Sequence, residues 1–161
     1  MIVGRETVKE RKSAQEKTRP VDVLDRYDDG GMKSVLVVDD DMSFLASIAE
    51  MVSLIDPEYD VMTAENGDQA ISILRTLPVG LLLTDIRMPV VTGSELVLWM
   101  KENMPRTPVI VMSAGNDADT VSAVEGAGYF FFDKPLDVTR LIGVINSLLQ
   151  KNKGDSTRTV R

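Results

Sequence analysis

Three carboxylates stand at the points where short apolar segments end. Asp39 and Asp40 follow the apolar run 35–38, and Asp85 follows the run 81–84. If these runs are neighbouring strands of a parallel sheet, the carboxylates meet at its carboxyl edge, where such sheets bind ligands. Two carboxylates about 4 Å apart repel each other by roughly 4 kcal/mol at an effective dielectric constant of about 20, so a cation must neutralise them. Mg²⁺ suits a site with few carboxylates, several waters and a phosphate.

The acidic triplet Asp39-Asp40-Asp41 also has a simpler interpretation, as a solvated turn that caps the next helix. Carboxylates at a helix N-terminus are stabilised by the partial positive charge there. This is the commoner role for an isolated acidic triplet, and it is the role we expect for Asp41.

Two more polar residues follow later apolar runs. Ser113 comes directly after 109–112, and Lys134 comes shortly after 129–132. Each residue alone is more simply a turn or solvated residue. Together with the acids, however, they place a hydroxyl and an ammonium at one sheet edge, which suits an anion bridged to a metal. Asp85 can then act as a nucleophile, because carboxylates form acyl phosphates, with the metal and Lys134 stabilising the transferred charge.

The elements that must position these residues alternate strictly along the chain. Strands are predicted at 35–38, 59–63, 81–84, 109–112 and 129–132. Helices are predicted at 43–55, 67–77, 92–101, 117–124 and 138–149, and the fourth has the weakest apolar face. Thr92 and Glu95 match a capping box at the start of the third helix. Because crossovers between parallel strands are right-handed, the alternation predicts a parallel sheet with helices on both faces.

Composition excludes several chemistries. The 161 residues include neither histidine nor cysteine, so no Ser-His-Asp triad, imidazole ligand, disulfide or thiolate zinc site can form. Residues 34–150 carry 17 acidic and 6 basic residues, a net charge of −11. That charge repels nucleic-acid phosphates, so we expect no direct nucleic-acid binding. No apolar run approaches the roughly 18 residues of a membrane span, so we expect no membrane association.

One domain is expected at residues 33–151, with a polar segment on each side. Residues 1–32 mix both charges and include the breaker Asp28-Asp29-Gly30-Gly31, which predicts a charged, largely disordered N-terminal extension. Met32 can itself serve as a start, so the extension is either functional or a mis-assigned start. Residues 152–161 are expected to form a polar tail, too short for an output domain.

Four motifs, taken in order, resemble the receiver domain of two-component response regulators. They are Val37-Val38-Asp39-Asp40, Leu82-Leu83-Thr84-Asp85-Ile86-Arg87-Met88-Pro89, Val111-Met112-Ser113-Ala114 and Phe131-Phe132-Asp133-Lys134-Pro135. The resemblance covers about residues 33–151 with the expected spacings. It implies a flavodoxin-like, doubly wound α/β fold with a five-stranded parallel sheet of order 2-1-3-4-5 and five helices. The chain would be a stand-alone receiver that acts through partners, or a fragment of a longer protein.

The resemblance also implies a phosphoryl acceptor and a set of metal ligands. Asp85 would accept a phosphoryl group from the phosphohistidine of a partner histidine kinase or histidine phosphotransfer protein. Asp40 would bind Mg²⁺ directly and Asp39 mainly through water. Asp85 and the main-chain carbonyl of Arg87 would complete the protein ligands.

A conformational switch is implied as well. Lys134 would bind the phosphoryl oxygens, and its peptide bond to Pro135 is expected to be cis. Ser113 would turn toward the phosphoryl group while Phe131 turns inward as the coupled aromatic residue. Position 131 is often tyrosine in this family, so Phe131 lacks the hydroxyl that could bond to the loop after the fourth strand. The fourth helix, fifth strand and fifth helix would present the output face to a downstream protein that the sequence does not identify.

Arg87 and Gly115 occupy positions that flank the phosphorylation site and vary in this family. We predict that Arg87 lies over the phosphoryl group and slows the attack of water.

Taken together, the site residues and the resemblance imply a cytoplasmic phospho-accepting switch. It would catalyse only its own phosphorylation and slow dephosphorylation, and would not be an enzyme otherwise.

Two alternatives belong to other classes of protein. A receiver-like adaptor would bind partners without phosphorylation, but the intact Asp40, Asp85, Ser113 and Lys134 argue against it. A Mg²⁺-dependent phosphohydrolase of the haloacid-dehalogenase type needs a second acid two residues after its nucleophile. This chain has Arg87 at that position, which disfavours the hydrolase.

Overall fold

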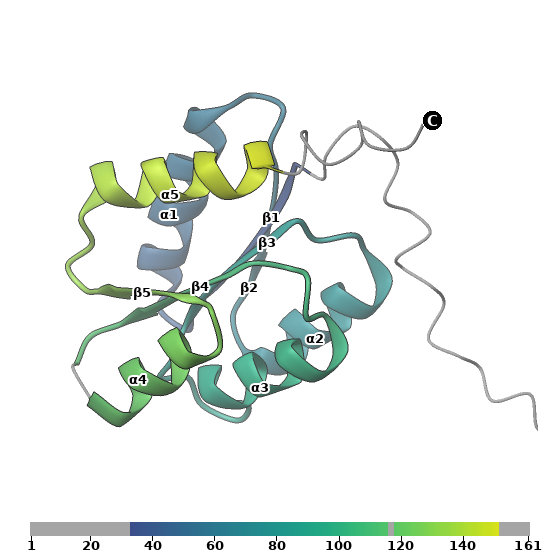
Figure 1. Cartoon of the computed structure of the whole chain (residues 1–161). Coiled ribbons are helices and arrows are strands. Elements are labelled where there is room, and N and C mark those ends of the chain that lie inside the picture. The colour runs from purple at the N-terminus through teal and green to yellow at the C-terminus, as the bar shows by residue number, and fades with distance from the viewer. Residues whose placement is uncertain (1–32, 116–117, 152–161) are drawn as a thin grey trace, which may run out of the picture.

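Strands and helices alternate along the whole of the described chain (Figure 1). The computed structural model describes residues 33–115 and 118–151, so the predicted extension 1–32 and tail 152–161 lie outside the described residues. The elements are β1 (Ser34–Val38), α1 (Met42–Ile55), β2 (Asp60–Ala64), α2 (Gly67–Thr76), β3 (Leu81–Asp85), α3 (Gly93–Asn103), β4 (Val109–Ser113), α4 (Ala118–Gly126), β5 (Phe130–Asp133) and α5 (Val138–Lys151). Their bounds agree with the predicted ranges to within two residues.

The sheet is parallel throughout and has the order β2-β1-β3-β4-β5. This arrangement confirms the doubly wound, flavodoxin-like order 2-1-3-4-5. In the register of the sheet, Val38 of β1 is paired with Thr84 of β3, and Asp85 is paired with Met112 of β4. Because β1 and β3 are neighbours and both point the same way, the residues that follow them meet at one edge of the sheet.

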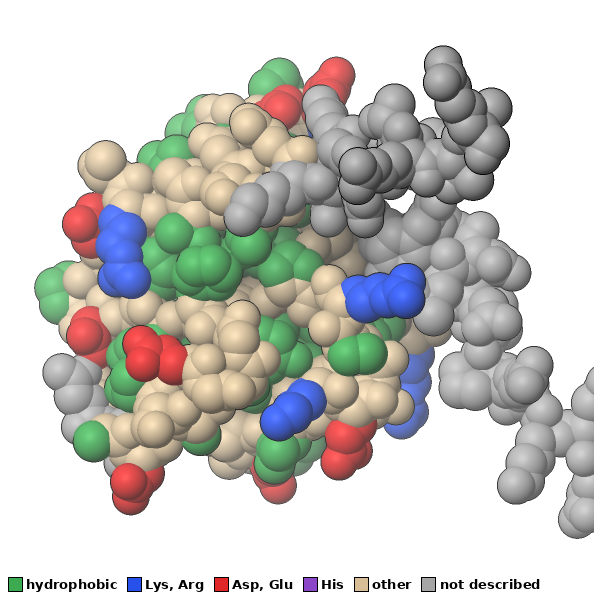
Figure 2. Space-filling model, viewed as in Figure 1, with side chains coloured by type: hydrophobic (Ala, Val, Ile, Leu, Met, Phe, Trp, Pro, Cys, Tyr) green, Lys and Arg blue, Asp and Glu red, His purple; other side chains and the backbone are tan. Residues whose placement is uncertain are grey.

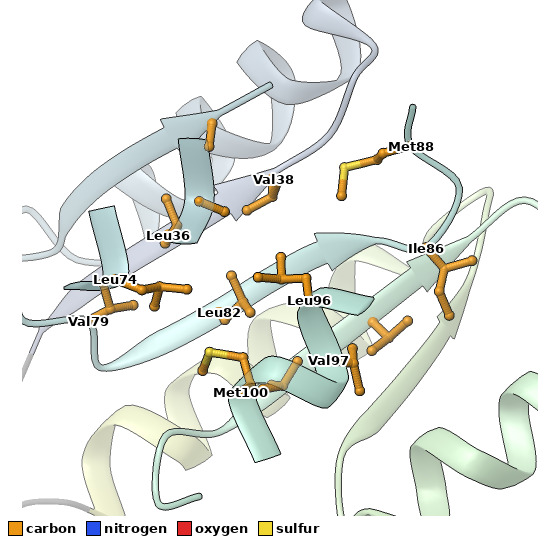
Figure 3. Packing of buried hydrophobic residues seen from close by; sticks show 14 of the residues in the cluster. Leu36, Val38, Leu74, Val79, Leu82, Ile86, Met88, Leu96, Val97 and Met100 are labelled. Atoms are coloured by element: carbon orange, nitrogen blue, oxygen red, sulfur yellow. The ribbon is translucent and has the colours of Figure 1, made fainter. Parts of the chain in front are cut away.

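Helices cover the sheet on both faces, with α1 and α5 on one side and α2, α3 and α4 on the other (Figure 1). Alternate strand residues point to opposite faces, which divides the interior into two cores. Figure 3 shows the α2–α4 core, where Leu36 and Leu82 of the sheet lie against Leu74, Leu96 and Met100 of the helices. The α1/α5 core contains the intervening strand residues, packed on side chains that include Leu45, Val52, Leu141 and Ile145.

The burial of each strand follows its place in the sheet. Every residue of β1, β3 and β4 is buried, which explains why these strands are apolar rather than alternating. The edge strands β2 and β5 are partly exposed. None of the helices in the described ranges is long and apolar enough to cross a bilayer.

Two predicted helix caps are present. The Oδ1 of Asp41 accepts hydrogen bonds from the backbone N–H groups of Ser43 (3.0 Å) and Phe44 (3.1 Å), which confirms that Asp41 caps α1. Thr92 and Glu95 form the reciprocal capping box of α3. These caps determine where the helices start relative to the strand ends, and so where the intervening loops lie.

Val90, in the loop between β3 and α3, adopts a φ of 71°, and the residue is 80% exposed. A β-branched residue is strained in this left-handed region, where it costs roughly 1–2 kcal/mol. We expect Val90→Gly to raise the free energy of unfolding by about 0.5–1 kcal/mol, because glycine adopts this φ freely but is more flexible when unfolded. Urea denaturation measures the change. Leu77→Gly, at a φ of −121°, is the matched control and should only lose stability; equal losses in both variants would contradict the interpretation.

Candidate functional site

Two buried carboxylates converge on one ammonium group at the carboxyl edge of the sheet. The Nζ of Lys134, in the loop after β5, lies 2.7 Å from Asp39 Oδ2 and 3.0 Å from Asp85 Oδ1. Asp39 is 1% exposed and Asp85 is 5% exposed, whereas Lys134 is half-buried. The structure therefore brings together three of the residues predicted from the sequence, from the ends of β1 and β3 and from the loop after β5.

Main-chain N–H groups orient both carboxylates. The Oδ1 of Asp39 accepts a hydrogen bond from the backbone N of Asp41 (2.9 Å), and the Oδ2 of Asp85 accepts one from the backbone N of Arg87 (2.8 Å). Each carboxylate thus has one oxygen bound by its own loop and the other bound by Lys134. Charge-assisted bonds of this kind hold both groups in a defined orientation at the edge of the sheet.

The two carboxylates also determine the protonation of Lys134. Burial disfavours the charged ammonium and lowers its pKa, but hydrogen bonds to Asp39 and Asp85 and the attraction of both charges outweigh this effect. The pKa of Lys134 is consequently raised above the usual lysine value, and the group carries a full positive charge at neutral pH. The protein itself therefore supplies part of the positive charge that the carboxylates require.

The type of donor at this edge fits Mg²⁺. The candidates are the carboxylates of Asp39, Asp40 and Asp85 and the main-chain carbonyl of Arg87, all of them the hard oxygen ligands that Mg²⁺ prefers. Three carboxylates against one ammonium leave an excess of two negative charges. Asp40 is exposed, and across residues 33–115 and 118–151 no three acidic side chains are gathered closely enough to hold a metal. The Asp40 side chain would have to turn inward to join Asp39 and Asp85.

Ser113 ends β4 beside the carboxylates, because its neighbour Met112 is the strand partner of Asp85. The residue is 1% exposed, and its hydroxyl donates to the main-chain carbonyl of Gly115 at 3.3 Å. Hydroxyl hydrogen bonds usually measure 2.5–3.0 Å between the heavy atoms, so this one is weak. The hydroxyl can therefore be drawn away by a stronger acceptor at the site.

The aromatic residues of β5 point to both sides of the sheet. Phe131, the predicted switch residue, is half-buried and packs against the α2–α4 core, whereas Phe132 is buried in the α1/α5 core. The Lys134–Pro135 peptide bond is cis, the isomer expected from the sequence.

Arg87 lies across Gly115 above this edge of the sheet. Its side chain is exposed, and a Cβ added to Gly115 would lie 2.9 Å from Arg87 Nη2 and 3.3 Å from Cζ. The guanidinium therefore rests against the loop that follows Ser113. The two variable positions singled out in the sequence are thus in direct contact.

One residue near the site was missed by sequence reasoning. The ring of Phe44, in the first turn of α1, lies with its centroid 3.9 Å from Lys134 Nζ. In the sequence, Phe44 is only one of several apolar residues at helical spacing. Its position three residues after the capping Asp41 was the one signal that it lies near the end of β1.

Comparison with known proteins identifies a family. A family model described as the response regulator receiver domain matches residues 35–146. The chain is 33% identical over 112 residues to the DNA-binding transcriptional regulator NtrC of Salmonella typhimurium, covering 69% of this chain and 24% of that protein. It is 31% identical over 121 residues to the probable transcriptional regulator ycf29 of Pyropia yezoensis, covering 73% and 54%. The chain thus spans between about a quarter and about half of the length of these relatives.

Solved structures show the same likeness. A response regulator receiver protein from Pseudomonas putida has a TM-score of 0.66 and 26% identity, over 71% of this chain and 95% of that chain. The beryllofluoride-activated NtrC4 receiver domain dimer has a TM-score of 0.68 and 29% identity, over 75% and 99%. The described part of this chain therefore corresponds to nearly the whole of each of these receiver structures.

Proposed function

The chain belongs to the response regulator receiver domain family, and we propose that it is a phospho-accepting switch of a two-component phosphorelay. Asp85 would take the phosphoryl group from a phosphohistidine of a partner kinase or phosphotransfer protein in the cytoplasm. The observation that carries the proposal is the buried Asp85 carboxylate, which shares the Lys134 ammonium with Asp39. The lack of histidine is consistent with a donor on another molecule.

The transfer requires one bond to form as another breaks. An oxygen of Asp85 attacks the phosphorus, the P–O bond forms as the P–N bond to the donor imidazole breaks, and the imidazole takes up a proton. Asp39, Asp40, Asp85 and the main-chain carbonyl of Arg87 would hold Mg²⁺, which when bound supplies positive charge at the transferred phosphoryl group. Lys134 would exchange the Asp85 oxygen for a phosphoryl oxygen while it remains bound to Asp39. Its charge thereby opposes the charge that develops during transfer.

Phosphorylation adds nearly one unit of negative charge at a site where few groups can bind the phosphoryl oxygens. Ser113 is one of them, because its weak bond to the Gly115 carbonyl is easily exchanged for a bond to a phosphoryl oxygen. Shifting an equilibrium from 1:99 to 99:1 requires roughly 5.5 kcal/mol of differential binding. Bonds from Lys134 and Ser113 together with the metal can supply much of it.

The output of the switch would be the face formed by α4, β5 and α5. Only Val124 of α4 is buried, so α4 is the most easily displaced of the described helices. Figure 2 shows hydrophobic side chains gathered between α5 at the top of the view and α4 at the lower left. Phe130 of β5 and Val138 of α5 are exposed hydrophobic residues of these elements. A face of this kind suits a protein partner.

Incubation with Mg²⁺ and acetyl phosphate, or with Mg²⁺ and beryllofluoride, tests the proposal. Acetyl phosphate should add one phosphoryl mass to the parent protein, and either reagent should change the fluorescence of Trp99, which packs half-buried on the α2–α4 core. Asp85→Ala should show neither change. A parent protein with no Mg²⁺-dependent response would overturn the proposal in favour of the phosphorylation-independent adaptor.

Arg87 is expected to prolong the life of the acyl phosphate, because its guanidinium rests on Gly115 beside the site. We expect Arg87→Asn to speed dephosphorylation about threefold to tenfold, or about 0.6–1.4 kcal/mol of barrier. Decay of the phosphorylated mass after removal of acetyl phosphate measures the rate. Arg106→Asn, which removes an exposed arginine elsewhere, should leave it unchanged. Equal decay rates in the parent and Arg87→Asn would show that Arg87 does not shield the site.

A further inference from the structure

We propose that Phe44 is a positioning residue for the Lys134 ammonium, which the face of its ring holds in place beside Asp39 and Asp85. The inference rests on the proposed phosphoryl transfer and adds a residue to its machinery. It starts from the 3.9 Å distance between Lys134 Nζ and the centroid of the Phe44 ring. That distance is well inside the roughly 6 Å within which a cation is attracted to an aromatic face.

The ring complements the other contacts of the ammonium. An ammonium has three N–H donors, and two are matched by Asp39 Oδ2 at 2.7 Å and Asp85 Oδ1 at 3.0 Å. Phe44 lies against the same nitrogen and attracts it through the negative face of the ring. A ring carries no net charge, so it holds the ammonium without neutralising it. The full positive charge of Lys134 therefore remains for the phosphoryl oxygens.

The ring itself is held in position from two sides. The backbone N–H of Phe44 donates to the capping carboxylate of Asp41 at 3.1 Å, so the first turn of α1 is anchored. Its side chain packs against the α1/α5 core. The backbone N–H of Asp41 in turn donates to Asp39 Oδ1 at 2.9 Å. One short turn between β1 and α1 thus positions both the Asp39 carboxylate and the ring that contact Lys134.

This arrangement matters when Lys134 changes partners. During transfer the ammonium must leave Asp85 Oδ1 for a phosphoryl oxygen while it stays bound to Asp39. The Phe44 ring restricts the ammonium on one side, so that less of its freedom is lost on reaching the phosphoryl group. An aliphatic side chain of similar size would fill the space but would not attract the charge.

The first test compares rates of Mg²⁺-dependent phosphorylation by acetyl phosphate. We expect Phe44→Leu to lower the rate about threefold to tenfold, and Phe44→Tyr, which keeps the aromatic face, to restore most of it. Trp99→Leu, which removes the ring that faces Arg75 at 5.8 Å on α3, is the matched control; followed by mass, its phosphorylation rate should be unchanged. Site-specific replacement of Phe44 by phenylalanines with increasing fluorination should lower the rate in steps, because fluorine withdraws charge from the ring with little change of shape. A rate that is equal across the fluorinated series would overturn the proposal.

The second test does not depend on phosphorylation. A double-mutant cycle of Phe44→Leu and Lys134→Met measures the coupling of the two side chains in the unfolding equilibrium constant, which we expect to be about twofold to fivefold. If the two side chains are coupled but acetyl phosphate does not phosphorylate the parent protein, the proposed function is overturned. The positioning role falls with it, and only the contact between Phe44 and Lys134 remains. Normal phosphorylation without coupling would overturn the role of Phe44 and leave the proposed function standing.

Discussion

Replacing Gly93 by alanine is expected to lower the free energy of unfolding by about 3 kcal/mol or more and to displace Asp85. A Cβ at Gly93 would overlap the main-chain carbonyl oxygen of Asp85 and lie 2.5 Å from the Cα of Ile86. Both are backbone atoms at the end of β3, which is paired with β1 and β4 and cannot yield locally. Overpacking against such a rigid neighbour costs about 1–3 kcal/mol and can exceed it. The hydrogen bond from Gly93 N to Ile86 O, 3.0 Å long, would be strained as well.

Gly143→Ala is the matched control for this prediction. Gly143 lies in α5, and a Cβ there would meet nothing within 4 Å. Because alanine has the higher helix propensity, this variant should gain up to about 1 kcal/mol. Urea denaturation of both variants measures the difference, and acetyl phosphate labelling of Gly93→Ala reports on the position of Asp85. Stability of Gly93→Ala close to that of the parent would show that the end of β3 can move.

Lys134→Met is expected to lower the free energy of unfolding by about 2 kcal/mol and to abolish phosphorylation. The substitution keeps most of the side-chain volume but leaves the buried Asp39 and Asp85 carboxylates without their shared cation. Removing one partner of a fully buried ion pair costs about 3–5 kcal/mol, and the partial exposure of Lys134 reduces that figure. Chemical denaturation and the acetyl phosphate reaction measure the two effects.

Magnesium and pH provide further readouts for this variant. Because Mg²⁺ would meet carboxylates that lack their ammonium, it should stabilise Lys134→Met more than it stabilises the parent. The pKa of Lys134 is raised in the folded protein, so the stability that its charge gives the parent is complete at neutral pH. This stability is lost as the pH rises through the pKa of the folded state. Lys101→Met, which removes an exposed charge from α3, is the control and should change stability by less than about 0.5 kcal/mol. A similarly small loss in Lys134→Met would contradict the role of the shared ammonium.

Much of the fold was predictable because most elements have a local sequence signal, such as an apolar run or a helix cap. The buried strands β1, β3 and β4 appear in the sequence as continuous apolar runs, and the Asp41 cap and the capping box of Thr92 and Glu95 mark the starts of α1 and α3. The edge strand β2 was predicted one residue too early, at 59–63 instead of 60–64. The reason is Tyr59, which is buried and donates from its hydroxyl to Asn146 at 3.1 Å instead of belonging to the strand. Such a contact between distant residues leaves no periodic signal.

The site was predictable only to the level of which residues approach the sheet edge. Strand ends in a parallel sheet share an edge, so Asp39, Asp85, Ser113 and Lys134 could be grouped from their positions after strands. The sequence could not show which contacts form there. In the structure Lys134 binds both buried carboxylates while Asp40 stays exposed, and Ser113 donates to Gly115. These contacts depend on the directions of the side chains, which are set by the conformations of the neighbouring loops.

By itself the sequence determined the alternation of elements, the acidity of the domain, the lack of histidine and the residues that are expected to carry the chemistry. Hydrophobic pattern, capping and composition are local properties, so they can be read along the chain. The tertiary structure alone decided that Phe44 faces Lys134, that Arg87 rests on Gly115 and that Gly93 must lie against the end of β3. Each of these contacts joins segments whose separation is set by how helices pack on the sheet, and a packing distance has no counterpart in the order of residues.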